Sequence, residues 1–567
     1  MSGTRPLLGN SGGAVEAPSD RTTKEETMLG HGQQLKMQPG RTLALALIVT
    51  LAGLGGLLAS GAADGATKGG KLIFAARQDI DTLDPHITSR AATRKILIQV
   101  TDTLTVINPQ DGSVQPGLAE SWEVSADAKT YTLKLKKNVK FHDGTSFDAA
   151  AVKFSFDRMQ EPLGAAGVAR AFLGPYEGSD VIDASTVRVR FKQPYAPFLR
   201  MAGLSPLGPI SPTAVKKMGQ DFSRKPVGTG PFMVQEWVTK DHVRLVRNPD
   251  YNWAPPGSKH QGQAYLDEIV WRFVPEATTR TAVLQTGEVS VAEDLSYADV
   301  AAFQRNRDVT LMRGVPAGTP WTIYPNVQRA PTDDVNVRRA LHHAISKDAI
   351  VRVVFHGQSQ PAWSLLQPPT PGYAPVAKEL YPYDPARARK LLDDAGWKPG
   401  GDGIRTKDGK RLELLWIFGT NNGYEEMAPL VQGMAREVGM DIQLREQPRA
   451  QMEEANRKSE HNIGELNWWF PDPSILTTNF HSSRLFGFNR PRLNNPDIDK
   501  ALDQAAGVSA EAPRMEQYRR LQRALFEMAV GVPLVDQVTI VGARKEVKDY
   551  RFNVVTFPVL YDVYLEK

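Results

Sequence analysis

The chain has 567 residues and not one of them is cysteine. Disulfide scaffolds, thiolate metal sites, cysteine nucleophiles and a lipid-anchored N-terminal cysteine are therefore all excluded. A fold without such cross-links must be held together by buried apolar surface. A composition of 41% hydrophobic and 23% charged residues provides that surface and is typical of a globular protein. We expect one large domain or two to three ordinary ones.

The charges of the chain are nearly balanced. Lys and Arg total 68 and Asp and Glu total 63, which leaves a formal net charge of +5 over the whole length. Nucleic-acid-binding modules concentrate positive charge on one face or in one tail. We therefore expect no nucleic-acid partner.

The N-terminal region has the pattern of an export signal. Lys36 and Arg41 precede an apolar run at 42–58, and small residues follow at 59–63. A charged region, an apolar region and a small-residue cleavage site are the parts of a signal peptide. We predict a signal peptide at 37–62 whose cleavage leaves a soluble periplasmic protein. An uncleaved anchor is the alternative, but the run is shorter than the roughly 20 residues that span a bilayer.

Residues 1–36 are polar and show no periodicity. They are interpreted either as an N-terminal extension or as a misassigned start, with translation beginning at Met28 or Met37. Because no cysteine follows the signal, no lipid tether is expected.

Strand and helix patterns alternate along the rest of the chain. Apolar and polar residues alternate over 131–135 and 187–191, which predicts strands with one exposed face. Asp384-Pro385 and Ser211-Pro212 are helix-start signals, and each is followed by a run that ends at a glycine. Further helical periodicity covers 337–355, 427–438 and 515–528. With no internal repeat of 20 to 50 residues, the sequence predicts a mixed α/β protein of roughly 500 residues with more than one lobe.

Several short motifs occur in one order along the chain. They are LDPH at 83–86, QPGLAESWEV at 115–124, YTL at 131–133, VKFHDGT at 139–145, PVGTGPF at 226–232, RNPDY at 247–251, DVNVRRAL at 334–341 and YDPARARKLL at 383–392. This ordered set resembles the extracytoplasmic solute-binding proteins of peptide-type ABC importers, family 5, which include dipeptide-, oligopeptide- and nickel-binding members. The motif residues themselves are typical of turns, caps and core.

The resemblance implies a two-lobed α/β clamp, the periplasmic-binding-protein fold, with an extra small subdomain in the first lobe. By similarity, the first lobe would comprise 63–104, 186–312 and 528–567, the small subdomain 105–185 and the second lobe 313–527. The chain would cross the hinge twice. A solute bound between the lobes would shift the population toward closure, which a membrane permease could sense.

One stretch bears on the ligand. In peptide-binding relatives, an Asp three residues after a Trp in the second lobe pairs with the amino terminus of the peptide. The stretch here is LNWWFPDPS at 466–474. If its Pro-Asp-Pro is aligned with that of the family, Trp469 occupies the amine-pairing position. If Trp469 is instead taken as the Trp, Asp472 stands three residues on, at the expense of a gap. The first alignment is preferred, and it leaves no carboxylate for an ammonium group.

Aromatic rings are the other candidates in the predicted second lobe. Trp468 and Trp469 could stack on a sugar, an aromatic group or a cation, although large aromatic side chains are as often core. Trp321 and Tyr324 lie just past the first predicted hinge crossing and come next. Asn421, after the predicted strand 412–418, is a weaker candidate.

The first lobe offers two candidates by similarity. In relatives, residues soon after the LDPH motif contact the ligand, and Ser89 and Arg90 stand at such positions. Arg90 could clamp a carboxylate or phosphate, or be an exposed loop arginine. No metal site is expected, because His342 and His343 are adjacent on a predicted helix, point about 100° apart and are interpreted as a surface pair.

The predicted function is that of a periplasmic receptor which captures a small organic solute, a peptide or peptide-like compound, and delivers it to an ABC importer. An oligosaccharide- or opine-binding receptor is the alternative. A secreted hydrolase or a chaperone-like binder is less favoured, because the chain after the predicted signal peptide has no Gly-x-Ser-x-Gly, Walker or His-Glu-x-x-His motif. We expect no enzymatic activity, no cofactor and a monomer.

Overall fold

The computed structural model describes residues 68–162, 168–420 and 423–566. These residues belong to one compact unit. The predicted extension at 1–36 and signal peptide at 37–62 lie outside the described residues. No helix in the described part of the chain has both the length and the apolar character needed to cross a membrane.

A seven-stranded mixed sheet is built around β1 (Lys71–Ala76). This strand pairs in parallel with β10 (Glu268–Phe273) on one side and β11 (Val291–Glu293) on the other. Antiparallel strands extend the sheet at both edges: β9 (His242–Arg247) and β8 (Phe232–Val238) beyond β10, and β20 (Thr539–Arg544) and β12 (Val309–Gly314) beyond β11. The helices that contact strands of this sheet are α2 (Ala91–Val100), α7 (Ala277–Gln285) and α8 (Tyr297–Phe303).

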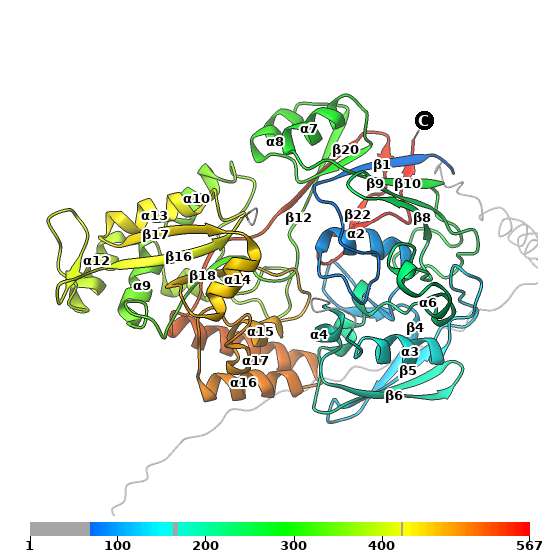
Figure 1. The fold of residues 1–567 in the computed structure, drawn as a ribbon, viewed down its shortest axis with the longest axis horizontal. Coiled ribbons are helices and arrows are strands. Elements are labelled where there is room, and N and C mark those ends of the chain that lie inside the picture. The colour runs from blue at the N-terminus through cyan, green and yellow to red at the C-terminus, as the bar shows by residue number, and fades with distance from the viewer. Residues whose placement is uncertain (1–67, 163–167, 421–422, 567) are drawn as a thin grey trace, which may run out of the picture. The chain divides into compact units, whose positions relative to one another are not determined.

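A five-stranded sheet forms a second core. Its order is β17 (Asp441–Gln447), β16 (Glu413–Gly419), β18 (Ile463–Leu466), β13 (Trp321–Pro325) and β19 (Val532–Val535). Strand β16 is buried on both faces, since alternate side chains pack on opposite helices. Leu414, Trp416 and Phe418 join the core of α9 (Val335–Ala344) and α13 (Ala428–Glu437), whereas Leu415 and Ile417 face α14 (Arg449–Arg457). Figure 1 shows α13 and α14 beside these strands.

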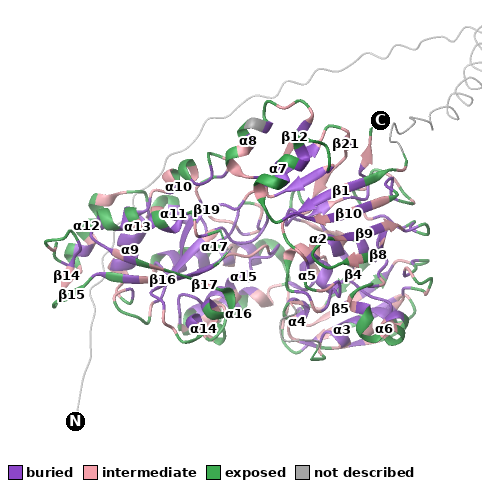
Figure 2. Cartoon of the chain, turned by 45° about the horizontal axis from the view of Figure 1, so that its top comes forward, coloured by how far each residue is buried: buried purple, intermediate pink, exposed green. Residues whose placement is uncertain are grey.

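The third sheet is antiparallel and has four strands in the order β4 (Ala119–Val124), β5 (Thr130–Leu135), β7 (Thr186–Phe191) and β6 (Tyr176–Asp183). Its inner face packs on α3 (Ala149–Arg158) through Leu133, Val189 and Phe156. Figure 2 shows buried residues along the strands and exposed residues on the outer helices, for example α6 (Pro212–Met218).

The remaining elements are short helices, hairpins and the helical layer next to the five-stranded sheet. They are β2 (Thr105–Ile107), β3 (Val114–Pro116), α4 (Ala169–Leu173), α5 (Phe198–Met201), η1 (Ser205–Leu207), η2 (Gly219–Ser223), α10 (Lys347–Val353), α11 (Val376–Leu380), α12 (Pro385–Asp394), β14 (Thr406–Lys407), β15 (Lys410–Arg411), α15 (Ile475–Phe480), η3 (Ser482–Arg484), α16 (Pro496–Gly507), α17 (Glu511–Glu527), β21 (Val547–Lys548), β22 (Arg551–Phe552), β23 (Pro558–Val559) and β24 (Tyr564–Leu565).

The predicted strands and helices are present. The alternating stretches 131–135 and 187–191 form β5 and β7, and the capped runs form α6 and α12. Ser211 accepts a hydrogen bond from the Ala214 N–H, and Asp384 accepts one from the Arg387 N–H, so both caps act as the sequence indicates. The run 337–355 divides into α9 and α10.

The motif residues build scaffold. Asp84 of the LDPH motif accepts two hydrogen bonds from Arg158, at 3.1 and 2.5 Å, and His86 lies between Arg158 and the Gly208 carbonyl. Because His86 is enclosed, burial lowers its pKa to about 4.

A second set of motif residues meets on the buried carboxylate of Asp102. It accepts hydrogen bonds from the Thr229 hydroxyl (2.9 Å), the Tyr251 hydroxyl (3.0 Å) and the Trp253 indole N–H (3.0 Å). The PVGTGPF and RNPDY motifs are thus tied together at the end of α2.

The sheets indicate where the chain passes between the lobes. It leaves β12 after Gly314 and enters β13 at Trp321, then leaves β19 after Val535 and enters β20 at Thr539. The predicted first lobe included residues 528–567. Strand β19 lies in this range, yet it pairs with β13 and so belongs to the five-stranded sheet. The predicted small subdomain ended at 185, yet β7, which follows that residue, pairs with β5 in the four-stranded sheet. We therefore propose crossings at 315–320 and 536–538, and a small subdomain that extends through 191.

His342 and His343 are 1% and 2% exposed, so the interpretation of a surface pair is wrong. Helix α9 packs them against α11, where the His342 ring stacks on Tyr381 at 4.0 Å. Neither ring nitrogen of His342 has a hydrogen-bond partner among the described residues. Burial, together with Lys347 and His343, lowers the pKa of His342 well below its usual value of 6.5.

We expect His342→Phe to make the protein more resistant to acid. In the unfolded chain this histidine binds a proton below pH 6.5, whereas in the folded protein it stays neutral, so stability falls as the pH falls. At pH 5 this effect should lower the free energy of unfolding of the wild type by about 2 kcal/mol, and His342→Phe should not show this decrease. Urea unfolding at pH 8 and pH 5 measures the difference. Exposed His356, replaced by Gln, is the control. Equal acid losses in His342→Phe and the wild type would refute the assignment.

Candidate functional site

The first proposed crossing segment, 315–320, is hydrogen-bonded through its backbone to segments of both predicted lobes. The Ala317 N–H donates to the carbonyl oxygen of Val554 at 2.8 Å, on the first-lobe side. The Phe470 N–H donates to the carbonyl oxygen of Ala317 at 2.9 Å, and the Thr319 N–H donates to that of Trp468 at 2.9 Å. The two predicted tryptophans are therefore fixed beside the hinge.

Trp469 packs on an apolar cluster at this point, which we call the hinge cluster. Its buried residues are Ile107, Ala317, Val554, Val555 and Phe557. The Trp469 ring meets Phe557 edge-on, with centroids 6.1 Å apart. Its indole N–H is enclosed and has no partner among the described residues. Trp469 is only partly buried, so it brings a ring and an unused donor to the hinge.

Helix α2 contributes the opposite wall of the hinge cluster. Ala91 and Ile98 pack on the cluster, and Arg94 and Lys95 lie between them at helical spacing on the same face. Lys95 Nζ is 5.8 Å from the centre of the Trp469 ring. One face of α2 thus places Lys95 beside the predicted tryptophan and Arg94 beside Phe557.

The two cations differ in their partners. Lys95 Nζ forms a buried ion pair with Glu293 at 2.5 Å, and Glu293 also accepts a hydrogen bond from the Arg77 N–H. Burial disfavours the charge of Lys95, but Glu293 and Asp294 outweigh it and raise the pKa of this lysine. Lys95 is therefore already neutralised.

Arg94 has no such neighbour. Its guanidinium lies over the Phe557 ring, 5.5 Å from the centre, and its side chain has no ion pair or hydrogen bond among the described residues. Burial alone lowers its pKa to about 10, so the side chain remains charged at neutral pH. This leaves a partly buried, unpaired guanidinium in the hinge cluster.

The other predicted aromatic residues divide into two groups. Trp468 and Trp321 are partly buried and meet Phe488 and Tyr424 edge-on, each with centroids 5.1 Å apart. Tyr324, in contrast, is 1% exposed and its hydroxyl accepts a hydrogen bond from Asn479. Tyr324 is therefore a core residue of β13 and does not line a surface.

Asp472 is fully buried in an ion-pair network. Both of its carboxylate oxygens accept hydrogen bonds from Arg514, at 2.9 and 2.5 Å, and Arg200 Nε lies 3.6 Å away. Burial favours the neutral acid, but the two arginines overcome it and hold the pKa of Asp472 below its usual value. With these partners, Asp472 is not free to accept an ammonium group.

Comparisons with known proteins assign the chain to a family. A family model described as bacterial extracellular solute-binding proteins, family 5 Middle, matches residues 113–486. The chain belongs to this family. The predicted resemblance is thereby confirmed.

Members and structures similar to this family-5 protein cover most of its length. The glutathione-binding protein GsiB of Escherichia coli (strain K12) is 29% identical over 493 residues, 84% of this chain and 91% of that protein. The structure of NikA from Brucella suis in complex with Fe(III)-EDTA has a TM-score of 0.78 and 28% identity, and the match covers 88% of this chain and 100% of that one.

Another similar structure is the ABC transporter-associated periplasmic binding protein DppA from Helicobacter pylori in complex with the peptide STSA. Its TM-score is 0.74 at 26% identity, over 88% of this chain and 99% of that one. The predicted two-lobed α/β fold class is confirmed by these matches.

The first-lobe candidates of this family-5 protein lie just before α2. Ser89 and Arg90 are exposed, and Arg90 Nη1 donates to the Asp79 carbonyl at 3.4 Å. Asn421 lies outside the described residues. The structure therefore brings Trp469 to α2 but does not bring Arg90 into the hinge cluster.

Sequence reasoning missed Arg94, Lys95 and Phe557. The helical spacing of Ala91, Arg94 and Ile98 could have placed the cation on an inward face. No local signal could have placed Phe557, which lies more than 460 residues further along the chain and meets α2 only in the folded protein.

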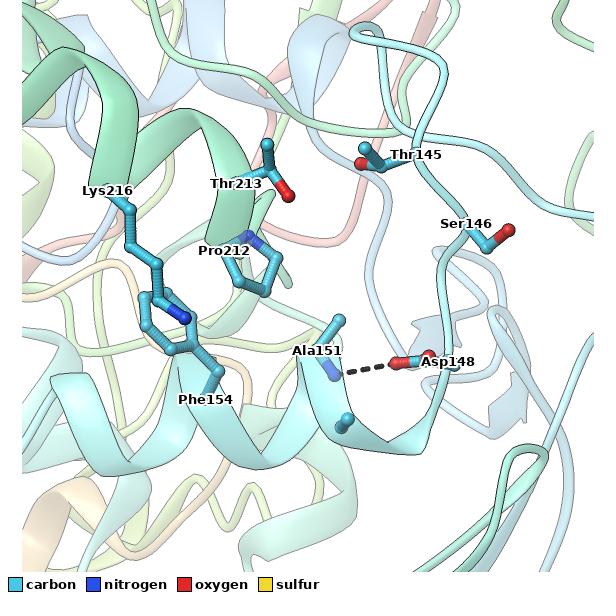
Figure 3. Close-up of a pocket in the computed structure, with 9 residues that line it drawn as sticks. Thr145, Ser146, Asp148, Ala151, Phe154, Pro212, Thr213 and Lys216 are labelled. Carbon is cyan, nitrogen blue, oxygen red and sulfur yellow. Dashed lines mark hydrogen bonds between the residues drawn. The ribbon is translucent and has the colours of Figure 1, made fainter.

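A hollow elsewhere on the surface is not part of this site. It lies between the start of α3 and α6 and is lined by residues such as Asp148, Phe154, Pro212 and Lys216 (Figure 3). Asp148 accepts a hydrogen bond from the Ala151 N–H and so caps α3. Within the described residues, no group of three or more His, Asp or Glu side chains is arranged to hold a metal ion.

Proposed function

We propose that this family-5 protein is a soluble periplasmic receptor that captures a peptide or peptide-like solute and delivers it to the membrane permease of an ABC importer. The observation that carries the proposal is the match to a glutathione-binding protein over 493 residues, together with TM-scores above 0.7 to binding proteins solved with their ligands. The receptor acts as a monomer, without a cofactor, enzymatic activity or a nucleic-acid partner.

The hinge gives the proposal a mechanism. The lobes are joined by the segments 315–320 and 536–538, and the first of these carries Trp468 and Trp469 through backbone hydrogen bonds. A solute on Trp469 would touch α2 of the first lobe and the 468–470 stretch of the second. Because such a solute gains contacts with both lobes only when they are closed, its binding favours the closed form.

An oligosaccharide- or opine-binding receptor is the second candidate. It is favoured by the two partly buried tryptophans, since indole rings stack on sugar faces, and by the absence of a free carboxylate at Asp472 for a peptide ammonium. Ligand identity separates the two candidates.

Native mass spectrometry of protein purified without refolding tests the proposed function. A retained peptide or peptide-like compound is expected, and glutathione is the first compound to titrate if the protein is empty. A retained sugar or opine would instead support the second candidate. Turnover of a substrate panel, or suppression of aggregation of a denatured client, would point to a hydrolase or a chaperone-like binder.

We expect Trp469→Ala to weaken binding of the retained solute, or of glutathione, by about 1 to 3 kcal/mol, because the solute loses its aromatic surface. Isothermal titration calorimetry measures the change. Trp237→Ala is the matched control, because Trp237 lies in β8, away from the hinge, where its ring contacts the guanidinium of Arg224. A loss below about 0.5 kcal/mol for Trp469→Ala would mean that this ring is only core.

A further inference from the structure

We infer that Arg94 is the anchor for a carboxylate of the solute, and that this receptor recognises its ligand by the acid group and not by the ammonium group. The inference rests on the proposed function and specifies the class of solute: an anionic compound with at least one carboxylate. Neither Ser89 nor Arg90, the first-lobe residues indicated by similarity, has this role.

The positive charge of Arg94 has no partner among the described residues. A guanidinium that is partly withdrawn from water loses hydration and normally regains it through an ion pair or hydrogen bonds. Arg94 regains neither from the described residues, and its Nε is fully enclosed. Arg94 is of intermediate exposure, and the arginines that are more deeply buried, below 9% exposure, each donate at least one hydrogen bond within the described protein: Arg158, Arg200, Arg280, Arg338, Arg405, Arg490, Arg492 and Arg514.

The buried charges of Lys95, Glu293 and Asp472 are each balanced by a partner of opposite sign. Lys95 and Glu293 neutralise each other, and Asp472 is taken by Arg514 and Arg200, with Arg200 also paired to Glu511. Asp294 and Arg77 both act on Lys95, with opposite signs, and so offset each other, while burial is the single influence resolved on Arg94. The charge left over is therefore positive, which favours a carboxylate and opposes an ammonium.

The guanidinium of Arg94 lies against an aromatic ring. Phe557 lies under the guanidinium of Arg94 and supports it, as aromatic rings commonly do for arginine. A planar guanidinium held in this way offers its edge to a carboxylate through two parallel hydrogen bonds. Trp469, which packs on the same cluster and has an unused indole N–H, adds a donor for a neighbouring polar group of the solute.

The test compares Arg94→Met with Arg90→Met, a matched arginine-to-methionine change one turn earlier. Each protein is purified without refolding, its retained solute is measured by native mass spectrometry, and glutathione, its diethyl ester and N-acetylglutathione are titrated by calorimetry. We expect the retained solute to carry a carboxylate.

We expect Arg94→Met to weaken binding about 10- to 100-fold. Arg94→Lys should weaken binding less than Arg94→Met does, and Arg90→Met should weaken it by less than twofold.

The ligand derivatives locate the interaction. In wild-type protein, blocking the carboxylates as esters should cost at least tenfold in affinity, while acetylating the amine should cost less than threefold. In Arg94→Met the ester and the free acid should bind equally. The melting temperature of Arg94→Met should equal or exceed that of the wild type, because no folded-state partner is lost; a structural arginine would lower it.

Several results would overturn the inference. A retained solute without a carboxylate, full binding by Arg94→Met, or a larger loss on acetylation than on esterification would each refute it while leaving the receptor function intact. If the wild type retains no solute and binds none of the three probes, the proposed function fails and the inference falls with it.

Discussion

Replacement of Asp472 by alanine is expected to lower the free energy of unfolding by about 3 to 5 kcal/mol. The carboxylate is fully buried and accepts two hydrogen bonds from Arg514, with Arg200 at 3.6 Å. Removal of the anion leaves two arginines withdrawn from water without their counter-charge, and such a loss costs more than the ion pair itself contributes.

Chemical unfolding monitored by tryptophan fluorescence measures this change. Asp503→Ala is the control, because Asp503 lies on the exposed side of α16 with 71% of its side chain accessible, and it should change stability by less than about 0.5 kcal/mol. If Asp472→Ala destabilises the protein by less than 1 kcal/mol, the network of Asp472 with its arginines is not a structural element.

The same network has a pH dependence with a definite sign. Burial raises the pKa of a carboxylic acid, but Arg514 and Arg200 reverse this and hold the pKa of Asp472 below its usual value. The contribution of the ion pairs is therefore complete above about pH 4 and declines as the pH falls through the folded-state pKa. Asp472→Ala should lose this acid-dependent part of its stability profile.

Local signals in the sequence agree with one another and predicted a mixed α/β protein with more than one lobe, whereas the two-lobed clamp was predicted from the resemblance of the ordered motifs to family 5. Caps such as Ser211 and Asp384 stand at the starts of the helices they predict, and the alternating stretches 131–135 and 187–191 form adjacent strands of one sheet. The ordered motifs are residues that tie distant parts together, as Thr229 and Tyr251 do on Asp102.

The site was predictable only in part. Trp469 was named from its place beside the Pro-Asp-Pro stretch, and it packs on the hinge cluster, next to the first proposed crossing segment. Asp472 was named for the same reason, but a carboxylate that will pair with Arg514, 42 residues away, looks no different in sequence from a free one. Whether a charged side chain has a partner depends on tertiary contacts, and this is also why Arg94 escaped notice.

Gly318→Ala is expected to destabilise the protein by about 3 kcal/mol or more and to reduce solute binding at least tenfold. Gly318 has φ +141°, a conformation that only glycine adopts readily. An added Cβ would overlap the carbonyl oxygen of Trp468 and lie 2.9 Å from the Phe470 nitrogen. The crossing segment would have to move away from Trp468 and Trp469, and the rings would lose their position against α2.

Gly433→Ala is the matched control for this prediction. Gly433 lies in α13 and a Cβ there would meet no atom within 4 Å, so alanine should stabilise the helix by about 0.5 to 1 kcal/mol and leave binding unchanged. Unfolding curves and calorimetric titration with the retained solute measure both variants. If Gly318→Ala keeps wild-type stability and affinity, the pairing of 317–319 with 468–470 does not hold the site, and the tryptophans must be positioned by their packing alone.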